Sequence, residues 1–114
     1  MSDYHESVEY LDEKAKNYVR ALHSLMEEIE AVDWYNQRVE SSKDEELKKI
    51  MAHNRDEEIE HAAMTLEWLR RNMPGWDEEL RTYLFTEGPI TELEDEEEAE
   101  EKSGSDDLGI GKLK

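Results

Sequence analysis

Several features that are common in proteins are missing from this chain of 114 residues. It contains no cysteine, which excludes disulfides, thiolate metal sites and iron–sulfur clusters. It has only two prolines, Pro74 and Pro89, and five glycines, so little interrupts regular structure before Pro74. It also has no run of about 18 apolar residues, so we expect no membrane-spanning helix.

Negative charge is the dominant feature of the composition. The chain has 32 acidic against 14 basic residues and a formal net charge of -18. Nucleic-acid binding is disfavoured, because a phosphate backbone requires a basic surface. Cation binding or simple solubility is favoured instead. The first ten residues, MSDYHESVEY, lack the pattern of a signal peptide, so we expect a cytoplasmic protein that binds neither membrane nor nucleic acid.

Apolar residues recur with helical spacing along most of the chain. A first helix is expected from about Glu6 to Glu40. Ser42 and Glu45 form a capping-box pattern, which predicts a second helix that ends near Asn72, before Pro74. A short third helix is expected at 75–86, followed by the Gly-Pro stop signal at 88–89.

The composition changes after residue 91. Eight of the ten residues from Glu92 to Glu101 are acidic, and such a run repels itself and favours disorder. The chain ends in LGIGKLK, where three apolar residues lie in a segment too short to fold alone. We therefore expect a helical domain at 1–91, an acidic disordered linker at 92–107 and a docking peptide at 108–114.

The expected fold is all-α: an antiparallel two-helix hairpin followed by a short C-terminal helix. Each long helix is covered on one side only by the other. Because a stable helical domain usually needs about four helices around one centre, two hairpins are expected to associate. The chain is thus predicted to form a ferritin-like four-helix bundle only when it dimerises.

Metal-binding side chains fall on or beside the apolar stripes of both long helices. At about 100° per residue, Glu58 lies about 60° from His61 on the buried stripe of the second helix. Glu28 lies at the border of the first stripe, about 60° from Leu25, and Tyr35 follows on the same edge. Burying a lone carboxylate is costly unless it is neutralised or binds a cation.

Two hairpins together would supply one Glu from each first helix and one Glu-x-x-His pair from each second helix. This is the ligand set of the di-iron carboxylate bundles. Carboxylate and imidazole ligands suit iron or manganese, with zinc as a competitor. Each chain would then hold half a site, completed near the two-fold axis of a dimer.

Other interpretations of these residues stay open. A Glu-x-x-His pair arises easily by chance on an acidic helix, and Glu28 and His61 have ordinary roles at a helix edge or in a core. Glu57, about 40° from His61 on the other side, is an alternative ligand to Glu58. Tyr35 is either a hydrogen-bonding or redox partner of the metals or an ordinary interface tyrosine.

A second group of polar residues lies on the opposite side of the first helix. His23, Glu27, Glu30 and Trp34 follow one another at spacings of four, three and four. A solvated face is the ordinary role of such charges. An oligomer that brings two copies of Glu27 and Glu30 together would instead form a low-affinity cation site.

Three segments carry a resemblance to a known family: MEEIEAVDWYNQRV, AHNRDEEIEHAAMTLEWLRRN and LRTYLFTEGPIT. They resemble the encapsulated ferritins, the two-helix ferritin-like cargo of bacterial and archaeal encapsulin nanocompartments. The match extends over about residues 22–91 and is dense rather than confined to one motif. It implies half ferritins that build a di-iron ferroxidase centre between two chains and assemble as a ring of five dimers, a homodecamer.

The resemblance also implies roles for particular residues. Glu28, Glu58 and His61 would be the ferroxidase ligands, with Tyr35 close to the metals. The resemblance further implies a metal-entry site, whose residues would be Glu27, Glu30 and Trp34. The LGIGKLK segment at 108–114 is similar to the peptide that docks such cargo onto the encapsulin shell protein.

The predicted function is ferroxidase activity for iron mineralisation and storage. The chain would oxidise Fe²⁺ to Fe³⁺ with dioxygen or peroxide, inside an encapsulin nanocompartment in the cytoplasm of a bacterium or archaeon. Two iron ions are expected at each dimer interface, and calcium, manganese and zinc are the expected substitutes. The alternatives are a non-catalytic helical scaffold or interaction module, and a di-metal peroxidase or oxidase not dedicated to iron storage.

Overall fold

The computed structural model describes residues 4–96 of the chain. By its internal contacts the chain divides into two compact units, Met1–Met73 and Pro74–Lys114. The expected docking peptide at 108–114 and most of the expected linker at 92–107 lie outside the described residues, so this division of the chain stays a prediction.

The first long helix begins later than the sequence pattern indicated. A short 3-10 helix, η1, covers Val8–Tyr10, and helix α1 covers Glu13–Ser41. The side chain of Asp12 caps α1, because its Oδ1 accepts a hydrogen bond of 2.8 Å from the backbone N–H of Ala15. The expected start at about Glu6 is therefore wrong: the apolar pattern continues upstream, but the capping residue sets the boundary.

Helix α2 covers Glu45–Asn72, and its predicted end at Asn72 is confirmed. Its N-cap is Asp44, whose Oδ1 accepts a hydrogen bond of 2.9 Å from the N–H of Leu47. The expected capping box with Ser42 is wrong, because Ser42 ends α1 and its hydroxyl accepts a hydrogen bond of 3.2 Å from the N–H of Asp44. Ser42 is thus the C-cap of α1, and Asp44 is the N-cap of α2.

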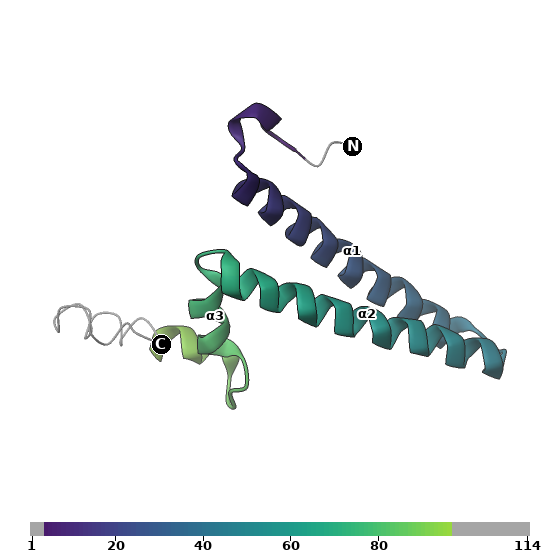
Figure 1. Ribbon diagram of the computed structural model, residues 1–114. Coiled ribbons are helices and arrows are strands. Elements are labelled where there is room, and N and C mark those ends of the chain that lie inside the picture. Colours follow the sequence, from purple (N-terminus) through teal and green to yellow (C-terminus); the bar gives the residue numbers. More distant parts are fainter. Residues whose placement is uncertain (1–3, 97–114) are drawn as a thin grey trace. The chain divides into compact units, whose positions relative to one another are not determined.

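Helices α1 and α2 run antiparallel and pack along each other (Figure 1). Polar links join them at two levels. The hydroxyl of Tyr18 donates to the carbonyl oxygen of Asn72 at 3.0 Å. Nearer the turn, Arg55 Nη1 donates to Asn36 Oδ1 at 3.0 Å. These links fix which turn of α1 faces which turn of α2.

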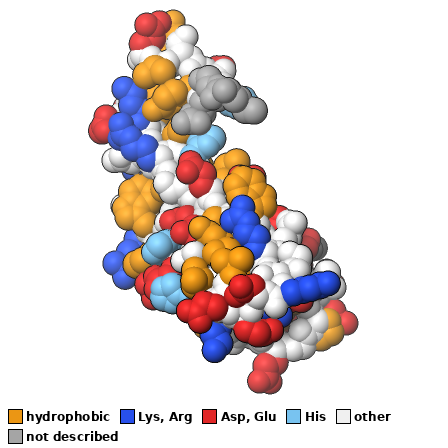
Figure 2. Space-filling view, turned by 90° about the vertical axis from the view of Figure 1, so that its right-hand side faces the viewer, with side chains coloured by type: hydrophobic (Ala, Val, Ile, Leu, Met, Phe, Trp, Pro, Cys, Tyr) orange, Lys and Arg blue, Asp and Glu red, His pale blue; other side chains and the backbone are white. Residues whose placement is uncertain are grey.

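The hairpin has almost no interior of its own. Among the described residues only Leu69 is fully buried. Large apolar side chains lie exposed among charged ones (Figure 2), and on the hairpin these include Met26, Ile29, Ile50 and Met64. The expected all-α hairpin is confirmed, with no strand in residues 4–96, and the four-helix bundle that would cover these side chains stays a prediction.

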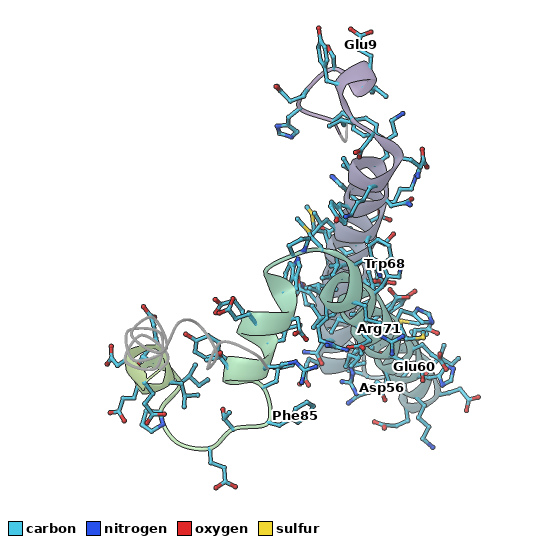
Figure 3. The ribbon with its side chains drawn as sticks, turned by 60° about the vertical axis from the view of Figure 1, so that its left-hand side comes forward. Glu9, Asp56, Glu60, Trp68, Arg71 and Phe85 are labelled. Carbon is cyan, nitrogen blue, oxygen red and sulfur yellow. The ribbon has the colours of Figure 1, made fainter. Side chains whose placement is uncertain are left out.

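The second unit contains helix α3, which covers Trp76–Tyr83. The expected helix at 75–86 exists but is shorter. Gly75 precedes it with a positive φ of 103°, a conformation that glycine adopts without strain. Phe85 follows α3 with a φ of 59°, and its side chain extends fully into solvent (Figure 3).

Residues 90–96 are also helical, so regular structure reaches the first residues of the segment expected to be disordered. None of the helices within residues 4–96 is both long and apolar enough to cross a membrane.

Candidate metal centre

The predicted Glu-x-x-His pair of α2 is close in space. Residues three apart on a helix lie on one face, and here Nδ1 of His61 lies 3.2 Å from Oε1 of Glu58. The Glu58 side chain is 24% exposed and the His61 side chain 41% exposed. The pair therefore lies at the edge of the hairpin, accessible to a further ligand or a second chain.

The backbone and a neighbouring carboxylate also surround His61. Thr65 Oγ1 donates to the carbonyl oxygen of His61 at 3.1 Å, one turn along the same face. Nε2 of His61 lies 4.0 Å from Oε2 of Glu57, while the other oxygen of Glu57 lies 3.4 Å from Nε2 of His53. Glu57 is thus near enough to His61 to stay an alternative ligand to Glu58.

Glu28 on α1 contains an unsatisfied buried atom. Its Oε1 is buried and has no hydrogen-bond partner, although the residue as a whole is half-buried. A buried polar atom without a partner costs roughly 1–3 kcal/mol, and a carboxylate more than a neutral group. Such an atom is stable in a finished assembly only when a cation or a hydrogen-bond donor approaches it.

One hollow is lined by residues of both predicted groups, the ferroxidase ligands and the metal-entry residues. It has a volume of about 420 Å³ and is lined by Ser24, Glu27, Glu28, Glu30, Ala31, Trp34 and Glu58. The sequence placed one group on the opposite side of the first helix from the apolar stripe. In the structure the hollow extends around the edge of α1, so that both groups contribute to its wall. His61 is not among its lining residues.

The hollow is strongly acidic. Four of its lining side chains are carboxylates, and none is Lys or Arg. Its two smallest lining residues, Ser24 and Ala31, were not singled out by sequence. Their spacing of seven places them on one edge of α1, where small side chains leave room between the carboxylates. An open acidic hollow attracts cations.

Tyr35 lies beside a cation from its own helix. The guanidinium carbon of Arg38 lies 5.2 Å from the centre of the Tyr35 ring, a cation–π contact. Sequence reasoning missed Arg38, although its spacing of three from Tyr35 was a usable signal. The half-buried Tyr35 ring is thus held on the edge of α1 one turn or more from Glu28.

One chain alone does not assemble a full metal-binding cluster. Within residues 4–96, no three His, Asp or Glu side chains lie close enough together to hold a metal ion. The single hairpin contributes the pair Glu58 and His61 from α2 and the unpaired carboxylate of Glu28 from α1. Whether a second chain completes the set stays a prediction.

Comparison with known sequences identifies one family. A family profile described as EncFtn-like matches residues 3–87. A protein of Thermotoga maritima called "Ferritin-like protein" is 64% identical over 110 residues, which cover 96% of each chain. A protein of Rhodospirillum rubrum called "Encapsulated ferritin-like protein" is 60% identical over an alignment that covers 96% of this chain and 86% of that protein.

Comparison with solved structures gives a similar fold. A crystal structure of a protein from Nitrosomonas europaea has a TM-score of 0.76 and 57% sequence identity. The similarity covers 78% of this chain and 98% of that one. The helical hairpin is therefore an arrangement that this chain shares with a crystallised relative.

Proposed function

The chain belongs to the EncFtn-like family of encapsulated ferritin-like proteins, and from this membership we propose that it is a ferroxidase, which oxidises Fe²⁺ to Fe³⁺ at a site between two chains. The observation that carries this proposal is the unsatisfied Oε1 of Glu28 in a hollow that Glu58 also lines. Glu58 in turn contacts His61 at 3.2 Å, which supplies the mixed carboxylate and imidazole donors that suit iron.

The substrate ions would bind between two copies of the hairpin. One chain supplies Glu28, Glu58 and His61, and two-fold symmetry doubles this set to the ligands of a di-iron carboxylate bundle. Glu58 would hold iron together with His61, because the two side chains are in contact and partly exposed at the edge of the hairpin. The ions would also neutralise carboxylates that otherwise repel one another across the interface.

The reaction removes one electron from each of two Fe²⁺ ions. Dioxygen would take up the two electrons and two protons to give hydrogen peroxide, or peroxide would take up two of each to give water. Carboxylate oxygens favour the product side, since hard anionic ligands match the harder Fe³⁺ ion. Tyr35, held by Arg38, lies on the same edge of α1 and would contact the metal region from one side.

Substrate uptake would begin at the acidic wall of the same hollow. Glu27, Glu30 and Trp34 line it together with the inner carboxylates. Exposed carboxylates bind Fe²⁺ weakly, which raises its local concentration without trapping it. We propose that an ion passes from this wall to Glu28 and Glu58 along the edge of α1.

The ferric product would be stored outside the protein. A small bundle of two hairpins has no cavity for a mineral, so storage would fall to a surrounding shell. One relative is named an encapsulated ferritin-like protein. We propose that the LGIGKLK segment at 108–114 docks this chain inside an encapsulin nanocompartment, and that the ring of five dimers is the assembled form.

The activity is tested by titrating the protein with Fe²⁺ in air. The absorbance of the ferric product reports the rate of oxidation. Glu28→Ala, Glu58→Ala and His61→Ala should each slow oxidation by more than about tenfold, because even ligand-supporting residues at metal sites contribute 10–100-fold. Glu60→Ala is the matched control, since Glu60 is an exposed carboxylate of the same helix. If the three variants assemble and oxidise iron as fast as wild type, the assigned site is wrong.

Two further measurements separate the alternatives. Elemental analysis after chelation and add-back of Fe²⁺ should give stoichiometric iron, whereas a purely structural scaffold should bind none. Co-expression of the full chain, and of a chain lacking 108–114, with an encapsulin shell protein tests the compartment. Only the full chain should co-purify with intact shells, and equal loading of both chains would contradict the docking role.

A further inference from the structure

Two methionines within residues 4–96 are more than half exposed. Met26 on α1 is 60% exposed, and Met64 on α2 is 57% exposed. The other two described methionines, Met51 and Met73, are half-buried. A thioether is a soft, apolar group that usually fills gaps in a core. An exposed thioether contributes little packing, and its sulfur is open to oxidation.

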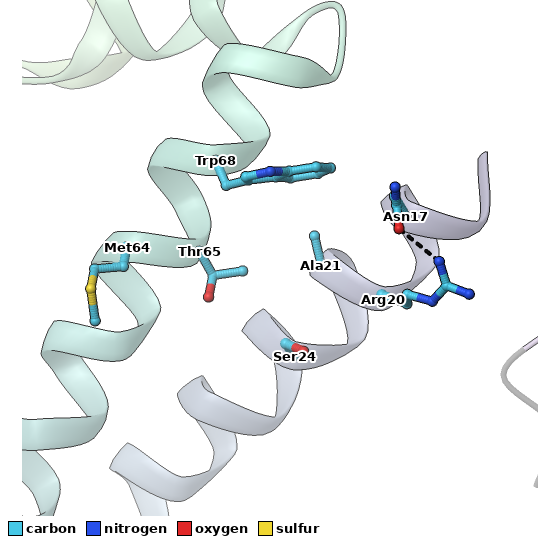
Figure 4. Close-up of a pocket in the computed structure, with 7 residues that line it drawn as sticks. All are labelled: Asn17, Arg20, Ala21, Ser24, Met64, Thr65 and Trp68. Carbon is cyan, nitrogen blue, oxygen red and sulfur yellow. Dashed lines mark hydrogen bonds between the residues drawn. The ribbon is translucent and has the colours of Figure 1, made fainter. Parts of the chain in front are cut away.

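Met64 lies one helical turn beyond His61, three residues further along α2. Residues at this spacing lie about 5–6 Å apart between their Cβ atoms. Side chains on a helix point back toward its N-terminus, and the thioether of Met64 extends along α2 in that direction (Figure 4). The sulfur is therefore directed toward the turn that carries His61, whose Nδ1 lies 3.2 Å from Oε1 of Glu58.

A groove connects Met64 with the proposed iron site. It has a volume of about 470 Å³, and its lining includes Met64 of α2 and Ser24 of α1. Ser24 also lines the acidic hollow that contains Glu28 and Glu58. Because the groove and the hollow share this small residue, a small molecule that leaves the hollow on this side passes Met64.

The proposed reaction supplies an oxidant for a thioether. Dioxygen that takes up two electrons from two Fe²⁺ ions, together with two protons, becomes hydrogen peroxide. Its concentration is highest where it forms, before it diffuses into the surrounding solution. A thioether one helical turn from His61 therefore meets this peroxide before a distant methionine does.

We propose that Met64 is a modification site, which consumes hydrogen peroxide formed at the iron site and becomes methionine sulfoxide. A sulfur lone pair attacks one peroxide oxygen, so that an S–O bond forms while the O–O bond breaks. The other oxygen leaves as hydroxide and takes the proton that remains on the new S–O group, which gives water. The sulfur loses two electrons and the peroxide gains two. The proposal rests on the proposed function, because iron oxidation by dioxygen supplies the peroxide.

Oxidation at Met64 would spare a contact that joins the two long helices. Trp68, one turn beyond Met64, extends toward α1 (Figure 4) and makes an edge-to-face contact with Tyr18 at 6.5 Å between ring centres. The Tyr18 hydroxyl also donates to the carbonyl oxygen of Asn72 at 3.0 Å. Damage to Trp68 would therefore weaken the hairpin, whereas a sulfoxide on an exposed side chain disturbs little packing and is reversed by reductases.

Peptide mass spectrometry tests the proposal by measuring the sulfoxide at each methionine. The full chain is given Fe²⁺ in air, with catalase in solution to destroy peroxide that escapes. Met64 should then carry several times more sulfoxide than Met26, although the two are almost equally exposed. With hydrogen peroxide added in place of iron and catalase, Met64 should be oxidised no faster than Met26, because exposure to the solution then decides the rate.

Met26 is the matched control within the same chain. It lies about 160° around α1 from Glu28 and is not among the residues that line the hollow. It is, however, one turn from Glu30 of the acidic wall. Preferential oxidation of Met26 during iron turnover would show that peroxide forms at the wall and would overturn the proposal. Equal oxidation of the two methionines would overturn it as well.

Two leucine variants test the consumption of peroxide. Leucine replaces methionine with little change of volume, so Met64→Leu should oxidise iron at the wild-type rate. Without catalase, this variant should release about one more peroxide per chain than wild type in the first turnovers, and Trp68 should be oxidised faster. Met26→Leu should match wild type in both measurements. A Met64→Leu protein that does the same would contradict the proposal.

The outcomes are distinct from those of the iron assay. Wild-type iron oxidation without sulfoxide at Met64 leaves the ferroxidase proposal standing and overturns this one. Absence of iron oxidation overturns the ferroxidase proposal itself, and this one with it. In Glu58→Ala, where iron oxidation should be slow, the excess of sulfoxide at Met64 over Met26 should disappear. An unchanged excess would show that the assigned site is not the source of the peroxide, and would refute the inference.

Discussion

Replacing Glu28 by leucine should stabilise the metal-free protein and weaken its response to metal. Glu28 Oε1 is a buried atom without a hydrogen-bond partner, which costs roughly 1–3 kcal/mol. The lower end applies, because the residue is only half-buried and its other oxygen is not so confined. Leucine removes this cost and keeps a side chain of similar length. A gain of about 1 kcal/mol corresponds to a rise of about 4–8 °C in Tm for a small domain.

Metal should reverse the order of stability. A ligand present at about a hundredfold excess over its dissociation constant adds about 2.7 kcal/mol to the folded state. Wild type should gain this with Fe²⁺ under anaerobic conditions, whereas Glu28→Leu should gain much less. Thermal unfolding followed by circular dichroism, at one fixed chain concentration with and without Fe²⁺, measures both effects. The variant should melt above wild type without metal and below it with metal.

The control for this experiment is Glu60→Leu. It makes the same chemical change at an exposed position of α2, so it should respond to Fe²⁺ as wild type does. A Glu28→Leu protein that is less stable than wild type without metal, and still gains as much from Fe²⁺, would refute the reasoning. Glu28 would then be an ordinary helix-edge residue.

Three other predictions concern assembly, pH and capping. Removal of metal should shift the mass distribution toward smaller oligomers, and Fe²⁺ or Ca²⁺ should restore the larger ones, because paired carboxylates repel without a cation; an unchanged distribution contradicts this. Hydrogen bonds from Arg70 and Arg71 lower the pKa of Glu67 from 4.5 to about 2. Since the folded pKa is the lower one, the stability difference between wild type and Glu67→Gln should be full above pH 4.5 and vanish as the pH falls to about 2. Asp44→Ala should lose about 1 kcal/mol in thermal unfolding by removing the cap on the Leu47 N–H, while Asp44→Asn should lose little.

The long helices were predictable because local rules determine them. No proline or glycine interrupts α1 or α2, and the end of α2 before Pro74 follows from backbone sterics. Helix starts were less predictable, since several residues near each turn are able to cap. Asp12 and Asp44 cap the helices, whereas the pattern favoured an earlier start for α1 and Ser42 as the cap of α2. Which candidate caps depends on the turn geometry, which depends in turn on how the helices pack.

Sequence spacing predicted that Glu58 and His61 are neighbours, but it did not predict the shape of the hollow beside them. Helical spacing places Glu58 beside His61, and in the structure Nδ1 of His61 lies 3.2 Å from Oε1 of Glu58. Spacing does not reveal that Glu28 has an unsatisfied oxygen, because burial of a single atom depends on the packing around it. Nor does it reveal that Glu27 and Glu28 line one hollow. A helical projection separates these neighbours by about 100°, yet both line the same hollow.

The small interior of the single hairpin and the proposed sharing of its metal site between two chains would have one physical origin. Among residues 4–96 only Leu69 is fully buried, so a second copy that covered exposed apolar side chains such as Ile50 would add stability. The same association would bring carboxylates such as Glu28 into a drier environment, where they are more costly without a cation. In the proposed dimer, apolar burial would favour association, and charge would oppose it until metal binds. A more complete core in one chain would remove this dependence, and metal would then have less influence on assembly.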